Sequence, residues 1–442
     1  MKLFLNRQVL AGAAVVTLLG GVAACASSSP PSSAGGASES TFGVNATGTV
    51  QFWARTVSKT LAQKLVSEFN ATHKNLQVKL TLTSINDDVT SLATSIRAGN
   101  PPDVVGLNDI DVPAFTKTGS FMDLTSAIDK LPYKQDLSPG HMGLAAYNGK
   151  QYGVPYWGDF SVLWYNKDLF RQAGLNPNDP PTTYTQILSD AQAINKLGHG
   201  VNGFTFAGDC QGCLGFTVQP GIWADGSHLM NGGISNQTAN IAGNTALEKA
   251  LTLYREIWTQ HLAPDNDRTD DGTTWGEDFV AGKIGIMPGG YGQVVDLAKP
   301  GQLGSELMDA PLPGSNGGYS TFDGGDDFVI PAAAKNSSGA WEFIQWVLQT
   351  AQQDQYPNLG ATPIRTDVLT PAFSAAHPLD AVPLKALGEG YAPPTLVYDQ
   401  MFNQAGGPWF QMFTTAVYDG NMTLALQQGQ SGLSRLLQQA TQ

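Results

Sequence analysis

The sequence has few of the residues on which metal sites and disulfide-rich scaffolds depend. Its 442 residues include only three cysteines and six histidines, and the histidines are scattered singly. A zinc site would need a second pair of ligands beside any cysteine pair. The sequence also lacks a nucleophile elbow, a Walker loop, a His-Glu-x-x-His pair and a dinucleotide fingerprint. We therefore expect neither a metal nor a cofactor.

Basic residues are also scarce. The chain carries 24 Lys and Arg against 37 Asp and Glu. Residues 1–24 hold two cations, Lys2 and Arg7, and no acid, so the chain from residue 25 onward has a formal charge of −15. This excess of acids argues against nucleic acid or anionic lipid headgroups as ligands. It suits neutral or cationic ligands.

The N-terminus reads as an export signal. Lys2 and Arg7 precede an apolar run over residues 9–24, and the sequence Val-Ala-Ala-Cys that ends at Cys25 resembles the bacterial lipobox. This resemblance implies cleavage before Cys25 and acylation of its thiol. A signal-anchor helix is the alternative, but it needs about 20 apolar residues, more than this run offers. We expect a signal peptide at 1–24, a flexible tether at 25–47, and a body anchored by lipid to the outer face of the bacterial cell membrane.

Cys210 and Cys213 form a Cys-x-x-Cys pair. An exported protein meets an oxidising compartment, which favours a structural disulfide between them. A thioredoxin-like dithiol and half of a zinc site remain as alternatives.

The region 48–111 carries the clearest secondary-structure pattern. Strands are predicted at 49–53, 78–82 and 103–107, with helices beginning near Ser58 and Asp88 between them. This β-α-β-α-β order predicts a parallel sheet. Ligands of such sheets bind at the carboxyl ends of the strands, here 53–55, 84–87 and 108–111.

A second α/β pattern follows the first. Helices are predicted at 182–197, 245–262, 275–282 and 340–350, and strands at 203–207 and 284–287, with Pro288-Gly289-Gly290 ending the last strand. No repeat of solenoid period is present. The chain thus belongs to the α/β class.

Several motifs identify a family. The segments 147–155 (YNGKQYGVP) and 162–170 (VLWYNKDLF) resemble the family 1 extracellular solute-binding proteins of ABC transporters, which are maltose-binding-protein-like sugar binders. Further matches follow in family order at 52–53, 101–105, 223–226, 278–287 and 339–343. The resemblance covers essentially all of 48–442.

The resemblance implies a two-lobed, type II periplasmic-binding-protein-like fold with three hinge crossings. In this family pattern, lobe 1 comprises 48–157 plus 325–370, and lobe 2 comprises 160–322 plus 375–442. Each lobe is expected to hold a mostly parallel sheet flanked by helices. The ligand would bind in the cleft between the lobes, which close by hinge bending.

A sugar needs hydrogen-bond partners for its hydroxyls and aromatic rings for its C–H face. The candidate ligand-binding residues, chosen by family position and strand ends, are Trp53, Arg55, Asn108, Asp109, Tyr156, Trp157, Asp159, Phe216, Trp223, Tyr291, Asp326 and Trp409. Asp326 replaces a small polar residue of the family, and its charge favours an amino sugar. Ordinary core packing is the alternative for Trp53, Trp223 and Trp409. Asp111 and Asp225 are expected to be surface or capping acids.

An acidic segment from Asp267 to Asp278 partly mimics a calcium loop, but Thr269 and Asp278 depart from the loop pattern. We interpret it as a loop that caps the next helix.

The sequence therefore predicts a monomeric binding protein rather than an enzyme. Its expected partners are a small carbohydrate and the permease subunits of an ABC importer, with no nucleic acid. A secreted carbohydrate hydrolase is the alternative, because paired carboxylates beside aromatic rings also describe a glycosidase.

Overall fold

The computed structural model describes residues 42–84, 87–379, 381–387 and 390–440. The predicted signal peptide, the lipidation site Cys25 and most of the tether lie outside these residues. Within the described ranges, no helix combines the length and the apolar character needed to cross a membrane.

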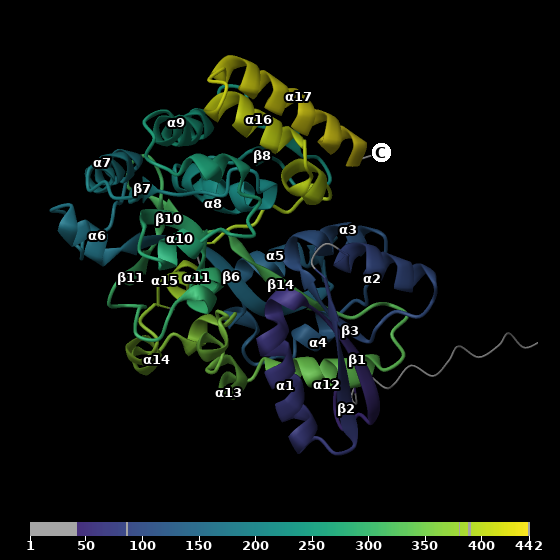
Figure 1. Ribbon diagram of the computed structural model, residues 1–442. Helices are drawn as coiled ribbons and strands as arrows, with labels where there is room; N and C mark the ends of the chain where they lie inside the picture. Colours follow the sequence, from purple (N-terminus) through teal and green to yellow (C-terminus); the bar gives the residue numbers. More distant parts are fainter. Residues whose placement is uncertain (1–41, 85–86, 380, 388–389, 441–442) are drawn as a thin grey trace, which may run out of the picture. The chain divides into compact units, whose positions relative to one another are not determined.

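The first five elements follow the predicted β-α-β-α-β order (Figure 1). They are β1 (Gly48–Arg55), α1 (Lys59–Thr72), β2 (Leu76–Thr83), α2 (Asp88–Arg97) and β3 (Val104–Asn108). β1 lies between β2 and β3 and pairs in parallel with both. The pattern forms because the apolar positions of α1, Leu61, Leu65 and Phe69, recur on one helix face that is buried. The predicted parallel sheet of this region is confirmed.

Two long strands, β6 (Gly153–Asn166) and β14 (Asp323–Val329), continue this sheet. The strand order is β2-β1-β3-β14-β6-β10-β7, where β10 is Ile284–Gly290 and β7 is Asn202–Phe204, and β11 (Leu307–Ala310) also pairs with β6. β10 and β7 are parallel, whereas β6 and β14 run antiparallel to their neighbours. β6 pairs with β14 through its first half and with β10 and β11 through its second half.

The predicted end of the strand at 284–287 is wrong. β10 runs on through Pro288 to Gly290, and Pro288 pairs with Leu163 of β6. β7 pairs only with Ile284 and Ile286, so the later residues of β10 have a partner on one side alone. A proline is tolerated there because its missing N–H removes no ladder bond on the open side.

Helices flank the sheet. The helices after α2 are α3 (Val112–Lys117), α4 (Thr125–Ile128), α5 (Pro139–Leu144), α6 (Lys167–Gln172), α7 (Tyr184–Asn195), α8 (Gln211–Ala224), α9 (Thr245–Thr259), α10 (Glu277–Val280), α11 (Tyr291–Leu297), α12 (Ser337–Val347), α13 (Thr350–Gln353), α14 (Pro371–Ala376), α15 (Ala381–Leu387), α16 (Pro408–Val417) and α17 (Met422–Ala440). The four helices predicted at 182–197, 245–262, 275–282 and 340–350 are present as α7, α9, α10 and α12. Short strand pairs are β4 (Ala146–Tyr147) with β5 (Lys150–Gln151), β8 (Met230–Asn231) with β9 (Thr238–Ala239), and β12 (Leu312–Pro313) with β13 (Tyr319–Ser320). In Figure 1, α16 and α17 lie side by side, as their contacts confirm.

Two large apolar cores divide the chain. One contains residues from 50 to 157 and from 328 to 364. The other contains residues from 163 to 322 and from 392 to 437, together with Ile110 and Leu144. Both cores contain residues of β6, and Phe322 of the second core directly precedes β14, whose Phe328 belongs to the first core. These two segments therefore connect the cores.

The acidic loop before α10 stabilises the local fold through its side chains. Asp267 is buried and accepts hydrogen bonds from Thr205 Oγ1 and the Phe206 amide, each at 2.9 Å. Asp271 accepts from Thr273. The N-cap of α10 is Gly276, with no side-chain cap, so the expected helix capping by this loop is not seen.

Candidate functional site

A cavity of about 770 Å³ opens at the carboxyl ends of β1 and β3. Residues that follow these strands line it, as do residues of β6 and β14, the start of α8, and the π-helical segment η7 (Asp399–Asn403). Ile110, Phe216 and Phe322 come from one core and Trp157 comes from the other. The cavity therefore lies where the two cores meet, at the strand ends predicted to hold a ligand.

The pairing of β14 with β6 brings the backbone close to the cavity floor. Gly325 pairs with Gly158 and has φ of +134°, and a Cβ there would lie 2.0 Å from the carbonyl oxygen of Trp157. Only glycine fits this position. The register then shifts between Asp326 and Asp327.

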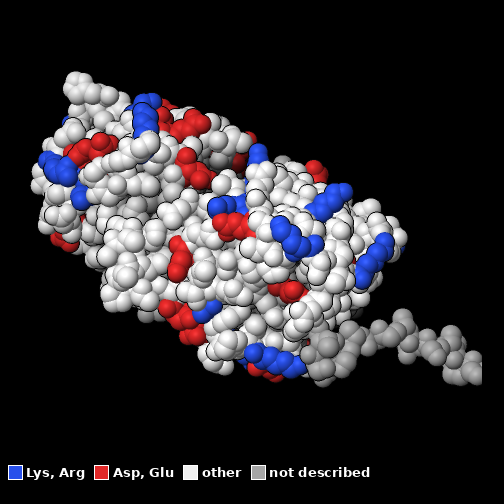
Figure 2. Space-filling model, turned by 90° about the horizontal axis from the view of Figure 1, so that it is seen from below, with Lys and Arg blue, Asp and Glu red and all other residues white. Residues whose placement is uncertain are grey.

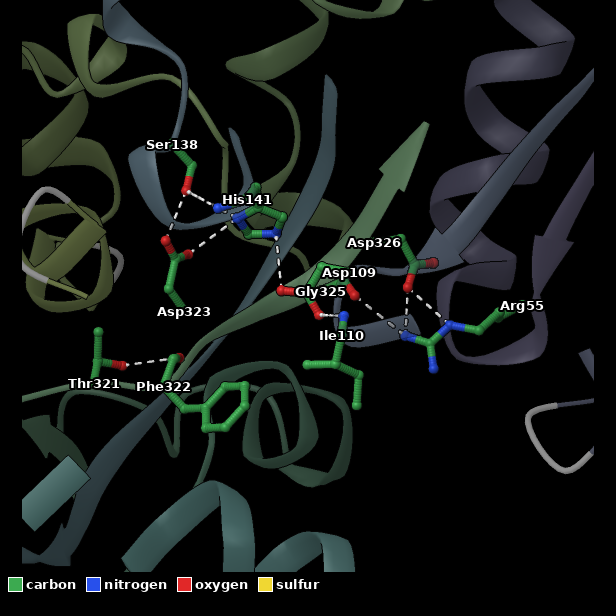
Figure 3. Close-up of polar contacts among 10 residues, drawn as sticks. All are labelled: Arg55, Asp109, Ile110, Ser138, His141, Thr321, Phe322, Asp323, Gly325 and Asp326. Atoms are coloured by element: carbon green, nitrogen blue, oxygen red, sulfur yellow. Dashed lines mark hydrogen bonds and ion pairs between the residues drawn. The ribbon is translucent and has the colours of Figure 1, made fainter. Parts of the chain in front are cut away.

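Asp326 faces Arg55. The guanidinium Nε of Arg55 donates to Asp326 Oδ1 at 2.8 Å, and Nη2 also contacts this oxygen (Figure 3). Asp326 is fully buried, and Asp88 lies 4.0 Å from the same guanidinium. Burial lowers the pKa of Arg55, but the charge and hydrogen bond of Asp326, together with the charges of Asp88 and Asp111, outweigh burial and raise this pKa. Arg55 lines the cavity, but its charge is already neutralised.

A second charged group is centred on His141 of α5, which does not line the cavity itself (Figure 3). His141 Nδ1 is 3.1 Å from Asp323 Oδ1, and Ser138 Oγ donates to Asp323 Oδ2 at 2.8 Å. His141 Nε2 is 4.0 Å from Asp109 Oδ2. All these side chains are buried. Burial lowers the pKa of His141, but the charge and hydrogen bond of Asp323, then Asp109 and Asp327, raise it to about 10. The imidazole is therefore charged at neutral pH.

Two carboxyl groups that interact with His141, those of Asp109 and Asp327, have raised pKa values. Burial, with smaller contributions from Asp327 and Asp323, holds the pKa of Asp109 well above its usual range despite the nearby His141. Burial also raises the pKa of Asp327 to about 7. Asp109 Oδ1 accepts from the Ile110 amide at 2.7 Å. The predicted ligand residue Asp109 therefore lines the cavity while one of its oxygens is engaged by the backbone and the other faces His141.

Two further carboxylates lie directly at the cavity. Burial first, then the charges of Asp88 and Asp399, raise the pKa of Asp111 to about 7, with Arg55 opposing. Burial raises the pKa of Asp159 to about 6. No Lys, Arg or His of the described residues forms an ion pair with either side chain. These groups can accept hydrogen bonds from a ligand.

Aromatic rings complete the lining. Trp157, Phe216, Phe115, Phe322 and Tyr398 all border the cavity. Trp157 is only 6% exposed, and its indole Nε1 has no hydrogen-bond partner among the described residues. The cavity therefore combines flat apolar faces with several carboxylate acceptors.

Of the predicted ligand residues, Arg55, Asn108, Asp109, Trp157, Asp159 and Phe216 line the cavity. The others do not. Tyr156 is buried and stacks on Phe328, with ring centroids 4.1 Å apart, while Trp53 packs partly buried beside β3. Asp326 lies behind Arg55. Its Oδ1 is engaged in an internal ion pair, and its predicted contact with an amino sugar stays a prediction.

Three predicted aromatic ligands lie in the cores instead. Trp223 packs against Phe322, Tyr291 stacks on Trp164, and Trp409 is fully buried. Trp409 occupies the buried face of the amphipathic helix α16, so the expected platform at this position is not formed.

Other residues line the cavity that were not predicted as ligand contacts. Asp111 lies at a predicted ligand-binding strand end and borders the cavity, but it forms no side-chain cap, contrary to its predicted role. Asp225 instead accepts hydrogen bonds from the backbone amide and the hydroxyl of Ser315, as expected for an acid outside the cavity. Asp88 follows a strand and could have been found by that position, whereas Tyr398 and Asp399 lie in a segment without a local pattern.

The Cys210–Cys213 pair is disulfide-bonded at the start of α8, with its Cα atoms 5.2 Å apart. Cys210 Sγ accepts from the Cys213 amide at 3.2 Å, which caps the helix. Both cysteines line the cavity.

The sheet order, the connecting strands and the cavity between two cores define a type II periplasmic-binding-protein fold. The sugar-binding protein MalE from Xanthomonas citri has this fold, and its structure matches with a TM-score of 0.77 at 22% identity, covering 89% of this chain and 98% of that chain. The chain belongs to the bacterial extracellular solute-binding proteins, whose sequence profile matches residues 64–381. The family resemblance and the fold class predicted from the sequence are confirmed.

Two relatives are named for the solutes they bind. The diacetylchitobiose-binding protein DasA of Streptomyces coelicolor is 25% identical over 294 residues, which cover 64% of this chain and 65% of DasA. The sn-glycerol-3-phosphate-binding periplasmic protein UgpB of Brucella abortus is 24% identical over 274 residues, which cover 59% of this chain and 60% of UgpB. The chain thus spans less than two thirds of the length of either relative. Both relatives are binding proteins rather than enzymes.

Proposed function

We propose that the protein is the extracytoplasmic solute-binding component of an ABC importer. It would capture a sugar or oligosaccharide in the 770 Å³ cavity and deliver it to the membrane permease. The observation that carries this proposal is the cavity itself, which lies between two cores and combines aromatic faces with carboxylate acceptors. Such a lining suits hydroxyl groups and sugar C–H faces. Acylation at Cys25 would keep the monomeric protein at the membrane.

The mechanism is closure of two lobes around the solute. We assign 48–157 plus 325–370 to lobe 1 and 160–322 plus 375–442 to lobe 2. The division of the two cores supports these boundaries, since β6 and β14 pass from one core to the other. A solute that contacts both lobes binds the closed form more tightly, and only this difference in affinity can shift the equilibrium toward closure.

The lining distinguishes between the solutes of the two relatives. Among the described residues, Arg55 is the one basic side chain that lines the cavity, and it is already paired with Asp326. The negative charge of a phosphate ester would therefore face mainly acidic side chains. Like charges cost free energy when brought together in a partly dry cavity. A saccharide without negative charge is therefore favoured over a glycerol phosphate.

Titration calorimetry against mono- and oligosaccharides tests the proposal, after mass spectrometry of any solute released from the purified protein. We expect a saturable heat and a smaller radius of gyration by X-ray scattering when the solute binds. Phe216→Ala should weaken binding about tenfold by removing a cavity ring. Tyr147→Ala, away from the cavity, should leave the affinity unchanged.

Two outcomes would contradict this function. Absence of binding across the saccharide panel would point to another solute class. Recovery of cleaved sugar after prolonged incubation would instead favour the hydrolase, which needs paired carboxylates across the scissile bond.

A further inference from the structure

The described cavity lining has an unbalanced charge. Its acidic side chains are Asp88, Asp109, Asp111, Asp159, Asp209, Asp271 and Asp399, and its basic side chain is Arg55. The face of the molecule in Figure 2 differs from this lining, because acidic and basic side chains are interspersed there. The acidic lining is therefore a property of the cavity rather than of every surface.

Some of these acids are compensated within the protein. Asp109 faces the His141 group, Asp88 lies 4.0 Å from Arg55, and Asp271 accepts two hydrogen bonds from Thr273. Arg55 itself is held by the buried Asp326. Among the described residues, no ion pair includes Asp111 or Asp399, nor the other lining acids Asp159 and Asp209.

Asp111 and Asp399 reach the cavity from the two proposed lobes. Asp111 lies in the turn after β3, whereas Asp399 lies in η7 of the C-terminal region. After burial and Asp88, the charge of Asp399 helps to raise the pKa of Asp111, so the two carboxylates are close enough to repel each other. A positive charge placed between them would remove this repulsion and connect the two lobes.

Other features of the cavity show what kind of cation fits. A metal ion is disfavoured, since no three His, Cys, Asp or Glu side chains of the described residues converge to hold one. The volume accommodates a molecule of several rings, and aromatic rings such as Trp157 and Phe216 line the cavity beside the acids. A saccharide with a positive charge would use both kinds of lining.

Building on the proposed solute-binding function, we propose that the solute is a saccharide with a protonated amine, which lies between Asp111 and Asp399. The ammonium group donates charge-assisted hydrogen bonds to both carboxylates. Cation binding then favours closure, because it replaces a repulsion between the two lobes with an attraction to each of them.

A matched pair of disaccharides tests this proposal by titration calorimetry. Chitobiose carries two free amines, whereas N,N′-diacetylchitobiose has the same skeleton without the charges. At pH 7.5 and low salt, we expect chitobiose to bind at least tenfold more tightly. The preference should shrink at 0.5 M salt, since partly exposed charges are screened.

Two variants locate the amine. Asp111→Asn and Asp399→Asn should each reduce the affinity for chitobiose at least tenfold and change the affinity for the diacetylated sugar less than twofold. Asp179→Asn removes an exposed carboxylate outside the cavity and should change neither affinity.

The possible failures are distinguishable. If neutral saccharides bind as tightly as chitobiose, or if both variants keep the preference, the amine proposal is overturned while the solute-binding function stands. Binding of spermidine without any saccharide would overturn the saccharide assignment in both proposals. If neither saccharides nor spermidine bind, both proposals fail.

Discussion

Two sets of carboxylates meet near the ends of β3, β6 and β14, and they differ in what neutralises them. The first set, Asp109, Asp323 and Asp327, surrounds the charged His141 and is buried. The second set, Asp111, Asp159 and Asp399, borders the cavity and forms no ion pair with the described residues. The first set has a cation supplied by the fold, whereas the second lacks one.

This difference separates a structural role from a binding role. Buried charge is costly unless it is paired, so an internal cation makes the first set part of the folded structure. Acids that border a cavity without a partner raise the free energy of the empty protein and can be relieved by a ligand. The same residue type therefore serves stability in one place and recognition a few residues away.

The largest expected effect comes from removing the internal cation. His141→Asn leaves the buried Asp323 without the imidazole that pairs with it, and we expect the free energy of unfolding to fall by about 3–5 kcal/mol. Urea denaturation measures this loss. His261→Asn, at an imidazole with 82% side-chain exposure, should change stability by less than about 0.5 kcal/mol.

A double variant sharpens this test. Adding Asp323→Asn to His141→Asn should recover part of the lost stability, because one uncompensated charge disappears. If His141→Asn alone costs less than about 1 kcal/mol, the carboxylates are neutral and the first set has no need of a cation.

The pH dependence of stability comes next in size. The pKa of Asp327 is raised to about 7 in the folded protein, so its stabilising contribution is present below the unfolded pKa and is lost as pH rises toward 7. From pH 5 to 7 this one buried group would lower the free energy of unfolding by about 2–3 kcal/mol. His141, with a pKa raised to about 10, adds a loss of the same sign between about pH 6.5 and 10.

Denaturation at constant ionic strength from pH 5 to 9 measures this dependence. The acids with lowered pKa values, such as Asp123 at about 2, change their contribution only below this range. Stability that rises with pH across the range would contradict the assigned protonation states.

The first region of the fold could be predicted because its signals are local. The apolar period of α1 and the alternation in β2 each lie within one element, and they indicate the parallel strand ends where Arg55 and Asn108 line the cavity. The contacts of Asp326 could not be predicted in this way. They depend on the pairing of β14 with β3, more than 200 residues earlier in the chain.

Residues in the C-terminal region show the same limit. The family pattern predicted Trp409 as a ligand-binding ring, but Trp409 lies on the buried face of α16 and packs in the core. Tyr398 and Asp399 reach the cavity through a π-helical turn that has no periodic signature. A tryptophan or an aspartate has the same sequence signal whether it faces a core or a cavity, so only the packing of distant segments decides its role.

The smallest expected effect is that of replacing Asp111, a member of the second set of carboxylates. Because no cation of the described residues forms an ion pair with Asp111, Asp111→Asn should raise the free energy of unfolding at pH 8 by about 1 kcal/mol while it weakens binding of an amine. At pH 5 the gain should vanish, since a carboxyl with a pKa of about 7 is already protonated there. Asp179→Asn serves as the control at both pH values. If Asp111→Asn raised the free energy of unfolding equally at pH 5 and pH 8, the effect of Asp111 on stability would not come from its charge. The proposed difference between the two sets of carboxylates would then be wrong.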